Sequence, residues 1–344
     1  MHMADALISP VVGGSMLATA AGLVAYSGRK IRLEGDESKT PLMGVLGAFI
    51  FSAQMINFAI PGTGSSGHLA GALLLAILLG PHAAFVAIAS VLTIQALFFA
   101  DGGLLALGCN IMNMGFFACF IAYPFVYRPL AGENPSRGRL MAASVFSAVV
   151  SLGLGALAVT VETVLSGVSA LPFLNFALLM LPIHLAIGLV EGLVTFAVIS
   201  FVRKSRPELF ASPKALATPP ISMRGVIVSF AVLAIVSAGA LSWFASTRPD
   251  GLEWAILKIT GQPELAEPAE GVRAGARRIQ ETTAFLPDYD FKPGPLESLS
   301  SAPANEEAGM VNMGASLAGI VGAGLTLGLT GLIGLGLRLR RSEL

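Results

Sequence analysis

Charged residues are scarce in this 344-residue chain, and so are cysteine and histidine. Aspartate, glutamate, lysine and arginine make up 12% of the residues, against roughly 25% in an average soluble domain. Hydrophobic residues make up 54%, and the mean hydropathy is +0.77. The 21 basic and 21 acidic residues cancel, so no nucleic-acid partner is expected. The long uncharged runs that remain predict an all-α polytopic membrane protein.

The sequence also lacks the common motifs of enzymes. It contains no G-x-x-x-x-G-K-[ST] phosphate loop, no catalytic-triad motif, no H-E-x-x-H and no cysteine-rich metal knuckle. Its two cysteines, Cys109 and Cys119, lie in one apolar stretch on roughly opposite sides of a helix, which excludes a disulfide between them. We therefore do not expect an enzyme, and any ATP hydrolysis must take place in another polypeptide.

Nine hydrophobic segments approach the ~20 residues that a bilayer requires. They cover residues 7–26, 42–60, 69–80, 83–100, 104–126, 140–161, 171–202, 225–244 and 313–337. The third segment is short and is separated from the fourth by Pro81. This pair is therefore either two spans or one broken helix with a re-entrant half.

Basic residues cluster after the first, fifth, seventh and ninth segments. With nine spans, all four clusters lie on the same side of the membrane, and the positive-inside rule makes that side cytoplasmic. We predict a multi-pass protein of the plasma or inner membrane, with its N-terminus outside and its C-terminus in the cytoplasm.

A proline-rich stretch divides the chain into two units. We expect a seven-helix unit at residues 1–205, a cytoplasmic linker at 206–223 and a two-helix unit at 224–344. Residues 245–312 of the second unit are polar and are expected to form an extracytoplasmic segment.

The first two residues form a potential chelate. No cleavable targeting segment is recognisable before them, and Met1 is expected to be retained because His2 is not a small residue. The α-amine of Met1, the amide nitrogen of His2 and one imidazole nitrogen of His2 close a five-membered and a six-membered ring in one plane. Such a field suits Ni(II) or Cu(II) rather than Zn(II) or Mg(II). The alternative is a frayed, unliganded terminus.

His68 is a candidate for the fourth nitrogen. It ends the segment Pro61-Gly-Thr-Gly-Ser-Ser-Gly-His68, whose glycines favour a tight turn at a membrane surface. The predicted topology places His68 on the same outer side as Met1, where it would complete the plane. The alternative is a surface turn that ends in an unliganded histidine.

Other polar residues are weaker candidates. His82 lies at a predicted cytoplasmic turn. His184 and Glu191 share one face of the seventh segment, where they form either a proton relay or a structural pair between helices. Three asparagines either hydrogen-bond between helices or support the metal ligands from outside: Asn57, Asn110 and Asn113.

Small residues form a stripe on the first segment. Gly14, Ala18 and Gly22 lie four residues apart on one helical face, and Ala21 and Ala25 lie beside them. Such a stripe permits close helix–helix approach. It serves either internal packing or docking of a separate subunit.

Several ordered motifs resemble the nickel/cobalt substrate-capture subunits of energy-coupling-factor (ECF) ABC transporters over roughly residues 1–205. They are Met1-His-Met-Ala-Asp-Ala-Leu-Ile-Ser-Pro10, Gly64-Ser-Ser-Gly-His-Leu-Ala-Gly71, Phe99-Ala-Asp-Gly-Gly-Leu-Leu-Ala-Leu-Gly108 with Asn110, and His184-Leu-Ala-Ile-Gly-Leu-Val-Glu-Gly192. The C-terminal unit is similar to the small accessory subunit of the same systems. Its signatures are Pro249-Asp-Gly-Leu-Glu-Trp-Ala-Ile256 and Phe285-Leu-Pro-Asp-Tyr-Asp-Phe291.

This resemblance implies both a ligand set and partners. Met1, His2 and His68 are implied to bind a transported Ni(II) or Co(II), with no permanently bound cofactor. The implied partners are a transmembrane coupling subunit, which would dock on the small-residue stripe, and cytoplasmic ATPases. Ser9-Pro10 departs from the family pattern, which bears on the packing of the first loop rather than on chelation. The Pro-Asp-Gly-Leu-Glu form favours nickel over cobalt.

Two rival hypotheses remain from the sequence. One is a membrane sensor or scaffold that works through residues 245–312 and is indifferent to extension of the N-terminus. The other is a proton-coupled carrier that uses His184 and Glu191 and needs no ATPase. The lack of paired intramembrane acids argues against the carrier.

Overall fold

The structure is a computed structural model that describes residues 1–34, 39–205, 223–266, 270–291 and 313–339. All but the last residue of the expected linker 206–223 lies outside this description, and so does the part of the expected outer segment at 292–312.

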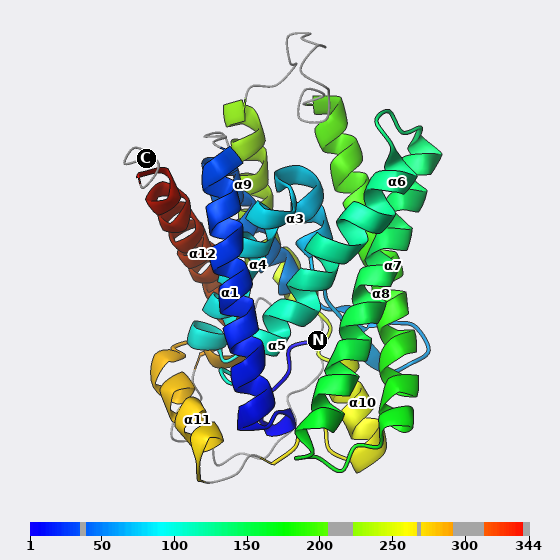
Figure 1. The fold of residues 1–344 in the computed structure, drawn as a ribbon, viewed down its shortest axis with the longest axis vertical. Helices are drawn as coiled ribbons and strands as arrows, with labels where there is room; N and C mark the ends of the chain where they lie inside the picture. The colour runs from blue at the N-terminus through cyan, green and yellow to red at the C-terminus, as the bar shows by residue number, and fades with distance from the viewer. Residues whose placement is uncertain (35–38, 206–222, 267–269, 292–312, 340–344) are drawn as a thin grey trace.

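Helices account for nearly all of the regular structure in the described residues (Figure 1). The longer helices are α1 (Pro10–Glu34), α2 (Lys39–Gln54), α4 (Pro81–Phe99), α7 (Arg137–Ser166), α8 (Phe173–Ser205), α9 (Met223–Gly239) and α12 (Met313–Leu339). The shorter ones are η1 (Asp5–Leu7), α3 (Ala72–Leu79), α5 (Leu107–Ile111), α6 (Arg128–Ala131), η4 (Leu241–Phe244), α10 (Gly251–Thr260), α11 (Val272–Thr283) and η5 (Pro287–Tyr289). A π-helical stretch, η2 (Met112–Tyr127), joins α5 to α6, and the strands are β1 (Phe58–Ile60) and β2 (Ser65–Gly67).

Six helices of the described chain are long and apolar enough to cross a membrane, namely α1, α4, the continuous run Leu107–Ala131, α7, α8 and α12. The apolar parts of α2 (Pro41–Gln54) and α9 (Arg224–Gly239) are shorter. The prediction of an all-α polytopic membrane protein is confirmed.

The region around Pro81 differs from a pair of full spans. Of the expected segment 69–80, only the 8 residues of α3 are helical, a length of about 12 Å at ~1.5 Å per residue, which is too short for a bilayer. Gly71 and Gly80 bound α3 with φ of 76° and 83°, values at which glycine is favoured over other residues. Pro81 then occupies the first turn of α4, where its missing N–H costs no hydrogen bond.

The expected second segment is also shortened. Its helix α2 ends at Gln54, and residues 58–60 form β1 rather than a helix. β1 pairs with β2 in an antiparallel hairpin in which Ile60 faces Ser65. The glycine-rich turn therefore becomes the tip of a hairpin, which fixes its direction.

Close helix crossings hold the bundle together. At Gly188 of α8, an added Cβ would lie 2.8 Å from the Cα of Val149 in α7, so only glycine permits this approach. At Gly44 of α2, a Cβ would lie 2.9 Å from the side chain of Leu327 in α12. α12 and α9 thus pack directly on α2, and the C-terminal unit is built into the bundle.

The molecule has two distinct ends (Figure 1). One end, which we call the hairpin end, contains the start of α1 together with α10 and α11. The opposite end, which we call the basic end, contains the ends of α1, α8 and α12 and the start of α9. The N-terminus turns inward from the hairpin end and finishes inside the bundle, above α10 in this view.

Candidate metal centre

The N-terminal segment is inserted into the protein core. Met1 is only 5% exposed and Met3 is fully buried. The Met3 N–H donates to Asn110 Oδ1 at 2.7 Å, and Asn110 Nδ2 donates back to the Met3 carbonyl at 3.2 Å. The Gly103 N–H donates to the same carbonyl at 2.8 Å. Asn110 therefore fixes the backbone next to the proposed chelate, as a supporting role for this residue requires.

The hairpin delivers His68 to the same place. Gly62 and Gly64 adopt φ of 77° and 79° in its tip, which other residues rarely adopt. At Gly67, a Cβ would lie 2.5 Å from the side chain of Ile187, so a larger residue would push β2 away from α8. These glycines allow the hairpin to enter the bundle and place His68 at its exit.

The imidazoles of His2 and His68 lie face to face. Their ring centroids are 5.0 Å apart, with an angle of 23° between the planes. His68 Nδ1 lies 3.0 Å from the Leu69 carbonyl. A carbonyl only accepts, so Nδ1 carries the proton and Nε2 keeps its lone pair for a metal.

The His2 ring lies between two acceptor oxygens, and a neutral ring donates to only one of them. Its Nδ1 lies 3.2 Å from Asp101 Oδ1, and its Nε2 lies 3.2 Å from Gln95 Oε1. Gln95 in turn donates to Gln54 Oε1 at 2.8 Å. The other oxygen of Asp101 accepts a hydrogen bond from the Tyr289 hydroxyl. The chelate predicted from the sequence involves one imidazole nitrogen of His2, and in the structure both ring nitrogens face these acceptors.

The Met1 amine faces a carboxylate from the C-terminal unit. It lies 3.1 Å from Asp250 Oδ2, and the Asp250 side chain is 16% exposed. The other oxygen, Oδ1, accepts the N–H groups of Leu252 at 2.7 Å and Glu253 at 2.9 Å, which caps α10. Burial by itself raises the pKa of Asp250, but the N-terminal ammonium and the Glu253 N–H together outweigh it and hold the pKa well below its usual range.

The site favours neutral imidazoles. Burial, together with the nearby N-terminal ammonium, lowers the pKa of His68 to about 3. Burial also lowers the pKa of His2, against the opposing effect of Asp101. Since only neutral imidazole coordinates a metal, these shifts favour the form of each ring that can bind one.

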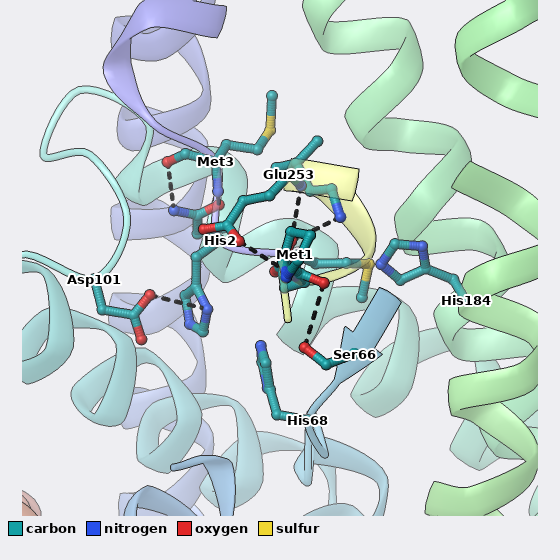
Figure 2. A network of polar contacts seen from close by, with 12 residues as sticks. Met1, His2, Met3, Ser66, His68, Asp101, His184 and Glu253 are labelled. Atoms are coloured by element: carbon teal, nitrogen blue, oxygen red, sulfur yellow. Dashed lines mark hydrogen bonds and ion pairs between the residues drawn. The ribbon is translucent and has the colours of Figure 1, made fainter. Parts of the chain in front are cut away.

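His184 and Glu191 contribute differently to this region. His184 Nδ1 donates to the Met180 carbonyl at 2.8 Å, and its buried Nε2 has no hydrogen-bond partner in the described part of the chain. His184 lines a cavity of about 10 Å³ beside Met1 and His68. Figure 2 shows Met1 between His2 and His184, with His68 below.

Glu191 holds the backbone that follows His68. Its two oxygens accept the N–H groups of Ala70 at 2.7 Å and Gly71 at 3.1 Å. The sequence left two roles open for this residue, a proton relay and a structural role, and this arrangement is of the structural kind.

The remaining candidates lie away from the two rings. The Asn57 carbonyl accepts the Ser246 N–H at 2.7 Å, which ties α2 to the C-terminal unit. Asn113 Nδ2 donates to Glu162 Oε2 at 2.7 Å and lies 3.7 Å from the Met3 sulfur.

The small-residue stripe is on the surface. Gly14, Ala18 and Gly22 are exposed on α1, and added Cβ atoms at Gly14 and Gly22 would meet no atom within 4 Å. Within the described residues, the stripe therefore does not serve internal packing.

A wide cavity reaches the centre. Its volume is about 790 Å³, and it lies between the N-terminal segment and α10 and α11, with His2 on its wall. Most of its charged lining residues are acidic: Asp5, Asp101, Asp250, Glu253, Glu264, Glu281 and Asp288, beside Arg277. Such a lining attracts cations.

Sequence reasoning missed Asp250, Asp101 and Gln95 as partners of the proposed ligands. Asp250 had a local signal, because Asp-x-x-Glu before an apolar run marks a capping box, and the structure forms that box. Nothing in the sequence indicates that this cap faces the N-terminus, 249 residues away.

The fold and the site define a multi-pass membrane protein with a buried, nitrogen-rich centre. Residues 2–209 match the family described as "Cobalt uptake substrate-specific transmembrane region", and residues 224–339 match the PDGLE domain. The chain belongs to this cobalt-uptake family and is a fusion of the NikMN/CbiMN type. Membership makes it a metal-transport protein rather than an enzyme, and the resemblance inferred from its motifs is confirmed.

Several related proteins are similar in sequence to half of this chain or more. A fused nickel transport protein NikMN of Rhodobacter capsulatus is 31% identical over 312 residues, which cover 84% of this chain and 88% of the relative. A putative fused nickel transport protein NikMN of Archaeoglobus fulgidus is 36% identical over 232 residues, 64% of this chain and 73% of the relative. The cobalt transport protein CbiM of Sorangium cellulosum is 31% identical over 52% of this chain and 79% of its own length. The crystal structure of a truncated transition metal transporter aligns with a TM-score of 0.51 at 33% identity, covering 59% of this chain and 98% of that one.

Proposed function

We propose that this protein captures Ni(II) at the extracytoplasmic face of the membrane and passes it to an ATP-driven import assembly of the ECF type. Met1 supplies its amine, His2 its amide and one imidazole nitrogen, and His68 the fourth nitrogen. The observation that carries the proposal is the meeting of the Met1 amine with two imidazoles whose rings lie 5.0 Å apart.

The acidic cavity provides the route to the site. A hydrated cation is attracted by the carboxylates of the cavity wall and reaches His2 there. Binding displaces protons from the Met1 amine and the His2 amide, and one nitrogen of the His2 ring leaves its acceptor oxygen. Since His68 already presents a free Nε2, it needs no deprotonation.

Nickel is favoured over cobalt for two reasons. A planar field of four nitrogens suits Ni(II), and the relatives that share the fused architecture are named as nickel transport proteins. Co(II) import by the same mechanism is the second candidate, since the matching family is described by cobalt uptake.

The import step requires partners. The proposed partners are a transmembrane coupling subunit and cytoplasmic ATPases, because the sequence has no phosphate loop. The exposed stripe of Gly14, Ala18 and Gly22 is the proposed docking face for the coupling subunit. In the proposed membrane orientation, the hairpin end and the N-terminus face outward, and the basic end and the C-terminus face the cytoplasm.

Metal stoichiometry tests the ligand assignment. His2→Ala and His68→Ala are expected to purify without nickel, whereas the unchanged chain binds one ion. His82→Ala is the matched control, because His82 begins α4 at the opposite end, where its ring contacts Tyr26 and Phe120. Full nickel content in either ligand variant would disprove the assignment.

Uptake by cells tests the transport assignment. ⁶³Ni and ⁵⁷Co uptake is compared with and without the ATPase partners, with each metal also used as competitor of the other. We expect uptake that depends on the ATPases and is faster for nickel. Uptake that persists without them would favour a proton-coupled carrier instead.

A further inference from the structure

The C-terminal unit contacts both segments that carry the proposed ligands. Residues 248–250, which precede α10, run between the N-terminus and the hairpin. We name these three residues the clamp. On one side, Asp250 pairs with the Met1 amine at 3.1 Å. On the other, the carbonyls of Arg248 and Pro249 accept the Ser66 hydroxyl at 2.7 Å and the Ser66 N–H at 2.8 Å. Figure 2 shows Ser66 and Met1 on this shared network.

The Asp250 carboxylate is rigidly oriented. Oδ1 is occupied by the two N–H groups that start α10, so Oδ2 is the oxygen that remains for the amine. Glu253 closes the box by accepting the Asp250 N–H at 2.9 Å. An acceptor fixed in this way selects one orientation of its donor.

The helix behind the clamp is anchored as well. Trp254 Nε1 donates to the Thr63 carbonyl in the hairpin tip at 3.0 Å. Gly251 lies against α8, where an added Cβ would be 2.6 Å from Ile183 and 3.0 Å from the His184 ring. The clamp is therefore held from several directions by the unit of residues 1–205.

We propose that Asp250 is a positioning residue for the metal site, which assigns a role to the C-terminal unit: it orients the Met1 amine and joins the N-terminus to the hairpin. A metal-bound primary amine retains two N–H groups, and one of them donates to Oδ2 while the lone pair binds the ion. The inference rests on the proposed function, because it needs the Met1 amine to be a ligand.

Charge supports the same arrangement. A divalent ion bound to one deprotonated amide keeps a single positive charge, and the buried Asp250 carboxylate balances it. Partners of this kind, which act through a ligand, typically contribute about 10- to 100-fold to metal affinity. Without the carboxylate, the amine loses both its orienting acceptor and its balancing charge.

Two substitutions test the role while preserving the helix. Asp250→Asn and Asp250→Ser both supply side chains that cap helices well, but neither offers a charged acceptor. We expect the Kd for Ni(II) of the full-length protein in detergent to rise about 10- to 100-fold, and the metal-free melting temperature to fall because the Met1 ammonium loses its carboxylate partner. The control is Glu133→Gln, which removes the same charge from an exposed residue between α6 and α7, away from the cavity, and is expected to leave the Kd unchanged.

A transport readout separates positioning from folding. In cells that contain the ATPase partners, the KM for nickel uptake should rise by the same factor as the Kd, whereas Vmax is retained at saturating nickel. A purely structural role would lower Vmax and leave KM unchanged, and that result overturns the inference.

The outcomes also separate this inference from the proposed function. If the unchanged chain binds no nickel, or if His68→Ala binds as well as the unchanged chain, the proposed function is wrong. If His68→Ala loses nickel but both Asp250 variants bind it with unchanged Kd, the metal site stands and the positioning role is wrong. Should Asp250→Asn fail to fold, Asp250→Ser decides the question.

Discussion

Adding three glycines before Met1 is the sharpest perturbation of the centre, because a single added residue would place His2 third from a new amine and create another planar four-nitrogen chelate. The change converts the Met1 amine into a neutral amide, which removes one proposed ligand and the positive partner of Asp250 together. Met1 is only 5% exposed, and the cavity beside it holds about 10 Å³, roughly one water-sized sphere. The additional residues therefore do not fit in the site without displacing the N-terminus.

The magnitude follows from the ion pair. Removing one partner of a buried pair costs about 3–5 kcal/mol because the other charge is left uncompensated. We expect the lower part of this range, since Asp250 keeps its two backbone N–H donors and is 16% exposed. In addition, the extended chain should lose the stabilisation that nickel gives, which is about 2.7 kcal/mol at a hundredfold excess over Kd.

Thermal unfolding with and without nickel measures both effects. The metal-free extended chain should melt at a lower temperature than the unchanged chain, and nickel should not raise its melting point. Asp250→Asn in the extended chain should restore stability, because it removes the uncompensated charge, but it should not restore nickel binding. The reasoning is refuted if the extended chain still binds one nickel ion, and such a result would favour the sensor or scaffold hypothesis.

Three further predictions concern pH, docking and loop support. Nickel affinity should rise between pH 6 and pH 8 by about tenfold per unit for each proton released; a calorimetric titration should show no contribution from His68, whose pKa is lowered to about 3 and which is therefore already neutral there. Gly22→Leu, on the exposed face of α1, should abolish ATP-dependent ⁶³Ni uptake while the purified protein keeps its nickel; unchanged uptake would exclude this docking face. Glu191→Ala should destabilise the protein by about 1–3 kcal/mol for each buried N–H left without its acceptor, those of Ala70 and Gly71, as measured by thermal unfolding; the carrier hypothesis instead predicts normal stability and loss of proton coupling.

Composition and motifs predicted the fold class and the family. Long uncharged runs were sufficient for an all-α membrane protein, since the hydrocarbon core admits few other structures. The convergence of Met1, His2 and His68 also agrees with the ligand set proposed from sequence. Their role as ligands stays a prediction, which the stoichiometry experiment addresses.

Hydrophobicity could not reveal where helices stop inside the bundle. The apolar residues of α3 read as part of a span, yet glycines with positive φ bound this helix at 8 residues. Likewise, Phe58–Ile60 is apolar enough to extend α2, but it pairs with Ser65–Gly67 as a hairpin. In both places, backbone conformation and strand pairing decide the structure, and hydropathy measures neither.

The partners of the ligands could not be predicted because they come from distant elements. Gln95 lies 93 residues from His2 and meets it only because α4 packs beside the N-terminal segment. Helix α4 ends at Ala100, which has a φ of 56°, and Asp101 is the next residue. Only the packed bundle brings these side chains together, so spacing along the chain carries no signal of them.

Covalent continuity between the two units has a consequence for assembly. Asp250 and the Met1 amine belong to one polypeptide, so their pairing is a first-order event whose extent does not vary with protein concentration. Every copy that folds therefore carries its own carboxylate in a fixed one-to-one ratio with its nitrogen ligands. A version split into two polypeptides would have to reach the same state by a second-order encounter in the membrane, with occupancy set by the expression of both parts.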